Sequence, residues 1–152
     1  MLSQAGSLLL FVGIASSLIL LSSVGRPIGA SSKNLVLFSQ ALPFVLLTYC
    51  FVTDARSIEL VYRFGGDDLP LFYRVSAVWS SRSGPLLLWA AMMAIVTRLM
   101  SNKEHVVSVE VAIMHAWTAF LLVLSAMLGP FESTISSTSS GLNPLLQTDL
   151  MV

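Results

Sequence analysis

The chain contains 152 residues, of which 55% are hydrophobic and 11% are charged, and its formal net charge at neutral pH is zero. This composition is too apolar for a soluble domain of that length, and the charged residues form no basic run that would bind nucleic acid. The single cysteine, Cys50, excludes an internal disulfide, and we expect its thiol to serve packing in an apolar helix. The sequence therefore predicts a protein embedded in a lipid bilayer.

Four apolar segments predict helices that cross this bilayer. A hydrocarbon core roughly 30 Å thick requires about 20 residues of helix, because a helix satisfies its own backbone polar groups there. The segments lie near residues 3–24, 35–53, 85–100 and 108–128. No basic region precedes the first segment, so we expect it to be retained rather than cleaved as a secretion signal. The predicted fold class is an all-α membrane protein, with a four-helix transmembrane region over 1–128 and an extramembrane tail over 129–152.

The long outer loop, residues 54–84, is predicted to carry an interfacial amphipathic helix near 69–81. Pro70 suits the first helical turn, and the two aspartates before it can cap the free N–H groups. One face of this helix is apolar, whereas Arg74, Ser81 and Arg82 lie away from it. The apolar face consists of Leu71, Phe72, Val75, Val78 and Trp79. Earlier in the loop, the segment IELVYRF lacks a clean alternation, which leaves strand and coil open.

Aromatic and arginine side chains around this helix are the candidate binding residues. Tyr73, Trp79 and Trp89 flank the outer membrane surface, where any membrane protein carries an aromatic belt. A second interpretation is a platform for a flat apolar ligand, with Arg74 or Arg82 available for an acidic group such as a propionate. The residues alone leave both interpretations open.

Among ionisable groups in the predicted spanning helices, only Glu110 and His115, both in the fourth, are candidate functional residues. Their spacing sets them well apart around the helix axis, so they do not form a natural ligand pair. We expect His115 to make an interhelical hydrogen bond or a packing contact, although ligation of a metal or haem remains open. No catalytic set and no metal site is predicted.

Loop charges give an expected orientation. The two short connections carry two basic residues each, and the longer outer loop carries four arginines, so the short connections are the more densely basic. Basic short loops favour the cytoplasm or matrix, which places both termini and the long loop on the opposite face. The basic residues of the short connections are Arg26, Lys33, Arg98 and Lys103.

Short sequence motifs indicate more about function than these physical patterns do. The segment YRVSAVWSSRSGPLLLW resembles Y-(K/R)-(I/V)-S-A-x-W-G-G-x-E-G-S-L-L-L-W of the large membrane subunit of the cytochrome c haem lyase, the CcmF/NrfE family. ALPFVLLTYCFVTDARSIELVY resembles that family's second helix and following loop, LGPFES its N-P-F-E element, and GLNPLLQ its D-G-x-G-L-N-P-L-L-Q element. Departures from the family pattern occur at Ser80, Ser81, Arg82, Ser83 and Pro85.

The resemblance implies a role in attaching haem to the Cys-x-x-Cys-His segment of apocytochrome c, with haem delivered by a haem chaperone. The family's I-H-P-P and tryptophan-rich haem-binding segments have no counterpart here, so its haem ligands carry over to no residue of this chain. We therefore expect the N-terminal piece of a split haem lyase, completed by companion chains, in the mitochondrial inner membrane or, alternatively, a bacterial inner membrane. The competing hypothesis is a non-catalytic remnant that serves as a structural subunit of another respiratory or assembly complex.

Overall fold

The computed structural model describes residues 1–66, 70–101 and 106–134. Within these residues the chain contains four long helices and no named strand. The helices are α1 (Leu2–Leu21), α2 (Ala30–Val52), α5 (Ser83–Met100) and α6 (Val109–Met127), each long and apolar enough to cross a membrane. The predicted all-α class with four spanning helices is therefore confirmed. The GLNPLLQ motif, Lys103 and His105 lie outside the described residues.

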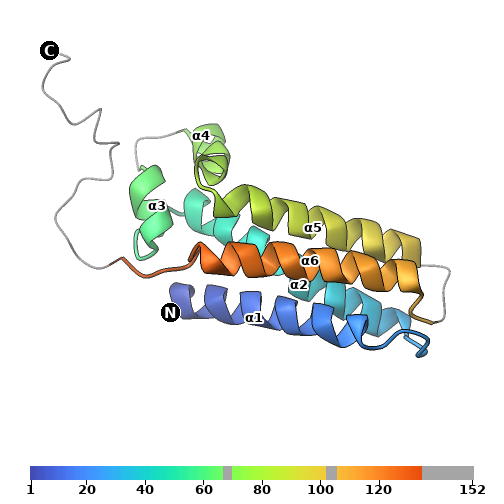
Figure 1. Cartoon of the computed structure of the whole chain (residues 1–152). Helices are drawn as coiled ribbons and strands as arrows, with labels where there is room; N and C mark the ends of the chain where they lie inside the picture. Colours follow the sequence, from blue (N-terminus) through green and yellow to red (C-terminus); the bar gives the residue numbers. More distant parts are fainter. Residues whose placement is uncertain (67–69, 102–105, 135–152) are drawn as a thin grey trace, which may run out of the picture.

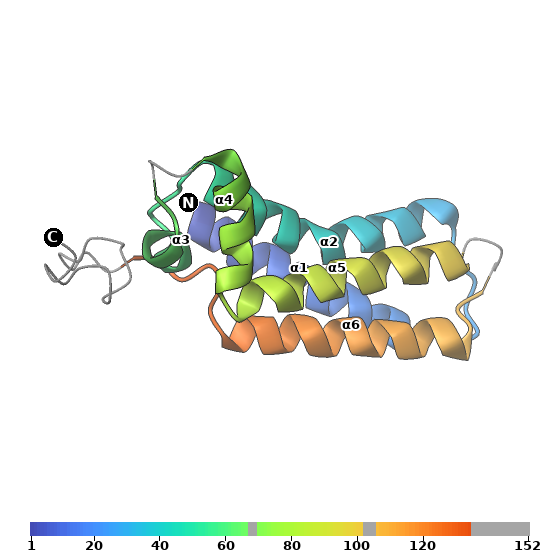
Figure 2. The same ribbon diagram turned by 90° about the horizontal axis from the view of Figure 1, so that it is seen from above.

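The long helices form an antiparallel bundle (Figure 1). Each packs against two neighbours, in the order α1, α2, α5, α6, and α6 then packs against α1, so the ring is closed. Figure 2 shows α2, α5 and α6 running alongside one another, with α1 behind them. The bundle therefore has two ends. We call the end with residues 22–29, 101 and 106–108 the short-connection end, and the end with the long loop the cap end.

The cap end is covered by three short elements and by the segment after α6 (Figure 1). The elements are α3 (Glu59–Phe64), α4 (Leu71–Ala77) and the 3-10 turn η1 (Val78–Ser80). Because IELVYRF forms a helix from Glu59 onward, neither strand nor coil describes it, and only Ile58 makes an isolated bridge, with Ser133. Whether α4 rests in the headgroup layer of a membrane stays a prediction.

Two helix boundaries differ from the hydropathy pattern for identifiable reasons. α1 ends at Leu21 because the hydroxyls of Ser22 and Ser23 donate back to the Ile19 carbonyl, and Gly25 then takes a φ of 76°. α2 begins at Ala30, before its apolar stretch, and its first turn directs Lys33 inward, where the ammonium donates to the Ser101 carbonyl. Polar groups therefore set both helix boundaries, and hydropathy alone does not predict their hydrogen bonds.

Backbone hydrogen bonds join the connections at each end of the bundle. At the short-connection end, the Gly25 N–H donates to the Val107 carbonyl at 2.9 Å, and the Val107 N–H donates to the Arg26 carbonyl at 3.0 Å. At the cap end, the Glu59 N–H donates to the Glu132 carbonyl at 2.9 Å. Connections far apart in the sequence therefore hold the helix ends in register.

A cluster of buried apolar side chains extends from the middle of the bundle to the cap end. Cys50 is fully buried in this cluster, which confirms the packing role expected for its thiol. Phe131, from the LGPFES segment, lies against α1 so closely that a Cβ on Gly6 would come within 2.3 Å of the ring. The other members of the cluster are Leu10, Leu47, Phe51, Ile58, Val61, Ala77, Val78, Leu87, Ala90 and Leu122.

Candidate functional site

The segment that carries the candidate residues crosses the cap end of the bundle as α4 and η1. Its inner side is fixed by Ala77 and Val78, which are buried in the apolar cluster. Its outer side presents Leu71, Phe72 and Trp79, with Phe72 78% exposed. The apolar face predicted for this helix is therefore divided, because Val78 turns toward the bundle while the larger side chains turn outward. The result is an exposed aromatic surface on a backbone anchored from below.

The three candidate aromatic residues are exposed but do not form one stack. Tyr73 is 59% exposed and meets the Phe72 ring edge-to-face, with 6.0 Å between centroids. Trp79 is 50% exposed on η1. Trp89 is 60% exposed and lies about 9 Å along α5 from its first residue, by helical rise, so it belongs to the outer side of the bundle. The structure therefore brings Tyr73 and Trp79 onto one short segment and places Trp89 deeper.

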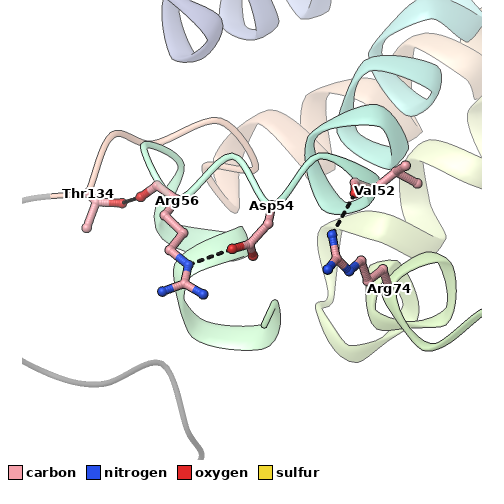
Figure 3. Close-up of polar contacts among 5 residues, drawn as sticks. All are labelled: Val52, Asp54, Arg56, Arg74 and Thr134. Carbon is pink, nitrogen blue, oxygen red and sulfur yellow. Dashed lines mark hydrogen bonds and ion pairs between the residues drawn. The ribbon is translucent and has the colours of Figure 1, made fainter. Parts of the chain in front are cut away.

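Arg74 has a positioning contact. Its Nη1 donates to the Val52 carbonyl at 3.1 Å, at the C-terminal end of α2 (Figure 3). The last carbonyls of a helix lack intrahelical partners and carry partial negative charge, so a guanidinium satisfies them well. Arg74 thus holds α4 against α2, a contact that the sequence pattern did not indicate.

Arg82 stands at the start of α5 and its side chain is exposed. The residues on either side of it are buried serines: the Ser81 hydroxyl accepts a hydrogen bond from the Gly84 N–H at 3.1 Å and lies 3.5 Å from the Ser83 hydroxyl. Gly84 permits the turn, because a Cβ there would lie 1.9 Å from the Val78 carbonyl oxygen. The family departures at these serines therefore fall on hydrogen-bonded, inward-facing positions, while Arg82 faces outward.

A second polar group at the cap end was missed by sequence reasoning. Asp54 adopts a φ of 49°, and its Oδ2 accepts from Arg56 Nε at 2.6 Å (Figure 3). The Arg56 carbonyl accepts from the Thr134 hydroxyl at 2.7 Å, and the Thr134 N–H donates to the Ser57 carbonyl at 3.1 Å. These contacts fasten the segment after α6 to the start of the long loop. The signals in the sequence were the resemblances of ALPFVLLTYCFVTDARSIELVY and LGPFES to family elements.

The site offers ring surfaces and a guanidinium but no ligand set. Among the described residues, no three His, Cys, Asp or Glu side chains are arranged to hold a metal ion. His115 lies inside the bundle, 5% exposed, with Nδ1 3.0 Å from Nε2 of Gln40 on α2, which confirms the predicted interhelical hydrogen bond. The described cap end can therefore contact the flat face or acidic edge of a ligand, while coordination requires residues from elsewhere.

Comparison with known proteins identifies relatives over most of the chain. The chain is 32% identical to the cytochrome c-type biogenesis protein ccl1 of Rhodobacter capsulatus over 70% of its own length. It is 29% identical to the cytochrome c-type biogenesis protein CcmF and 28% identical to NrfE, both of Haemophilus influenzae, over 97% of its length. It spans 18% of ccl1 and 26% of each Haemophilus protein. No protein-family model matches the chain, and no solved structure matches it significantly.

Proposed function

Because the chain belongs to the family of cytochrome c-type biogenesis proteins named CcmF, CycK and NrfE, we propose that its four-helix bundle works in the attachment of haem to apocytochrome c. The activity itself belongs to a larger assembly, of which this bundle is one part. In that assembly the cap end faces haem and the apocytochrome. The short-connection end lies in the cytoplasm or matrix, in keeping with its denser basic charge.

The observation that carries this proposal is the meeting of two family-like segments in space. Val78, from YRVSAVWSSRSGPLLLW, and Phe131, from LGPFES, belong to one buried cluster. In the sequence, Val78 precedes α5 and Phe131 follows α6. The same packing that buries Val78 leaves Trp79 and Arg82 exposed. An anchored backbone with an outward ring and guanidinium suits a surface over which a flat, acidic cofactor is handled.

The described residues of this face can contact haem but do not ligate its iron. Trp79 and Tyr73 would contact its ring system, with Arg82 beside a propionate, whereas Arg74 already donates to the Val52 carbonyl. The described residues of the face include no histidine, so we propose that haem is ligated by other haem-lyase segments carried on companion chains. A haem chaperone and apocytochrome c would reach the bundle through that assembly. The proposed location is the mitochondrial inner membrane, with a bacterial inner membrane as the alternative.

The experiment is purification of the tagged chain from its native membrane in mild detergent. Partners are identified by mass spectrometry, and haem by its absorption spectrum. Recovery with a haem-bearing chain that contains I-H-P-P and tryptophan-rich segments supports the proposal. The measured mass of the tagged chain shows directly whether those segments are on a separate polypeptide. Recovery without haem and without such a chain contradicts the proposal.

A structural role in another membrane complex is the second candidate, and the two buried serines beside Arg82 favour it. Ser81 and Ser83 are buried at the beginning of α5, where the family pattern carries glycine and glutamate. Their hydroxyls support the helix start and offer no acid for proton transfer. This candidate predicts recovery with unrelated respiratory or assembly subunits, and normal cytochrome c maturation when Arg82 and Trp79 are replaced.

A further inference from the structure

Three buried polar side chains meet inside the bundle toward its short-connection end. Gln40 on α2 is 1% exposed, Ser17 on α1 is fully buried and His115 on α6 is 5% exposed. Nε2 of Gln40 donates to the Ser17 hydroxyl at 2.7 Å and lies 3.0 Å from Nδ1 of His115. One amide group thus connects three of the four spanning helices.

The directions of these hydrogen bonds follow from Ser17. Its hydroxyl donates to the Gly13 carbonyl at 2.8 Å, so it accepts from Gln40, and the amino group of the amide must face it. The same amino group then donates to Nδ1 of His115, which leaves the ring proton on Nε2. Oε1 of Gln40 is buried and has no hydrogen-bond partner among the described residues. A buried acceptor is therefore left without a partner inside the bundle.

Both Gln40 and His115 line a cavity between the helices at this end. Its volume is about 20 Å³, which is room for one water molecule. The lining continues through Thr97, Lys33 and Ser101 to Ile28, Arg98 and Val106, which are partly exposed. The cavity therefore leads from the short-connection end toward the imidazole, which by helical rise lies about 9 Å along α6 from its first residue.

The chemistry of the lining selects the ligand. A buried carbonyl without a partner is costly, and lipid offers it no donor, whereas a water molecule bridges two to four polar groups. The described lining holds two basic side chains and no acidic one, which disfavours a metal cation. We propose that this cavity is a water site that connects His115 to the aqueous phase at the short-connection end. Polar groups within spanning helices commonly mark such water or proton paths.

Deuterium exchange at the imidazole C2 position tests this proposal, because it requires water at the ring and is read by mass spectrometry for each histidine. The whole chain is reconstituted in lipid bilayers, and the same chain denatured gives the rate for full access. We expect His115 to exchange measurably. Ala94 lines the cavity and is 2% exposed, so Ala94→Val should slow the exchange roughly tenfold by narrowing the path.

Ala91→Val is the matched control, since Ala91 is buried on the same helix but does not line the cavity. Circular dichroism confirms that each variant folds. If Ala94→Val fails to fold, Thr97→Val takes its place, and we expect slower exchange because it removes a hydroxyl from the lining. A wild-type His115 that does not exchange overturns the proposal. So does an exchange rate that the folded cavity variants leave unchanged. The readout is water access alone, so it is independent of haem attachment.

Discussion

Individual side chains at the cap end divide into those that hold the backbone and those that face outward. Arg74 and Asp54 are committed to contacts within the protein, to the Val52 carbonyl and to Arg56 respectively. Trp79 and Arg82 are exposed and sit on a backbone that is already fixed by Val78. Substitutions in the first group should therefore change stability, and those in the second group should change activity.

Trp79→Ala should lower cytochrome c maturation without lowering the abundance of the chain in the membrane. The side chain is half exposed, so its removal leaves no cavity in the core, whereas truncating an aromatic contact residue often reduces binding roughly tenfold. The measurement is holocytochrome c per unit of chain. Trp117→Ala, at a similarly exposed tryptophan on α6, is the control and should leave maturation normal. Equal loss of maturation and abundance would indicate packing instead.

Arg82→Glu should also lower maturation, while leaving the fold as stable as before. The residue precedes the first turn of α5, where a negative charge interacts favourably with the helix dipole by about 0.5 kcal/mol. Arg82→Lys keeps the charge and should retain most of the activity. Thermal unfolding in detergent measures stability, and holocytochrome yield measures activity. Unaltered maturation in Arg82→Glu rules out contact with an acidic group.

Asp54→Val should destabilise the protein by about 1–3 kcal/mol, because a β-branched residue is strained at the left-handed φ that Asp54 adopts. The variant also loses the 2.6 Å pair with Arg56. Asp54→Asn tolerates this conformation and should cost much less. Unfolding in mixed micelles with increasing denaturant compares the two. Equal stability of both variants would show that the backbone conformation at this position is unimportant.

At the scale of elements, the short helices of the cap end depend on close backbone approach. Gly84 lies directly against the Val78 carbonyl, which fixes the angle between η1 and α5. Glu59 donates its N–H to the Glu132 carbonyl as α3 begins. Neither α3 nor α4 is long enough to be stable alone in water, so tertiary contacts keep them helical.

Gly84→Ala should therefore displace η1 from α5. A Cβ 1.9 Å from a carbonyl oxygen cannot be accommodated without movement of the backbone, and we expect a loss of about 2–4 kcal/mol. Gly29→Ala is the control, since a Cβ there meets nothing within 4 Å. Thermal unfolding and limited proteolysis of the long loop measure the effect. A Gly84→Ala protein that is as stable and as protease-resistant as Gly29→Ala would contradict this packing.

Sequence reasoning succeeded where hydrophobicity decides the structure. The four spans follow from composition and length, and the burial of Cys50 and the interhelical bond of His115 follow from their place in apolar helices. It failed where tertiary bonds decide. The pattern of IELVYRF does not predict that Ile58 forms an isolated bridge and that α3 begins at the next residue. The sequence also does not predict that Arg74 donates to a carbonyl of α2. Local pattern cannot show which distant backbone groups need a partner.

At the scale of the whole molecule, the bundle presents two chemically different ends on opposite faces of a membrane. The cap end carries the exposed aromatic surface, and the short-connection end carries the cavity that Lys33 and Arg98 help to line. Apart from these ends, the outside of the ring is apolar, with exposed side chains such as Phe11, Phe38 and Ile113 directed outward from different helices. Lipid or other spanning helices can cover this surface.

The orientation itself is testable with introduced thiols. Ser57→Cys at the cap end and Ser22→Cys at the short-connection end both replace exposed residues, and the natural thiol of Cys50 is fully buried. A membrane-impermeant maleimide added to right-side-out vesicles, whose outer surface is the face away from the cytoplasm or matrix, should label Ser57→Cys. Ser22→Cys should react only after the membrane is permeabilised. The reverse pattern would invert the proposed orientation.

The closed ring of helices also has a consequence for synthesis. Gln40 can pair with Ser17 as soon as α1 and α2 are in the bilayer, but His115 lies 75 residues farther along the chain. At a translation rate of about 5–20 residues per second, the amide spends roughly 4–15 s without its third helix. During that interval a half-built protein exposes a polar flank to lipid, which suits a membrane insertase or a chaperone that shelters nascent helices until the last one arrives.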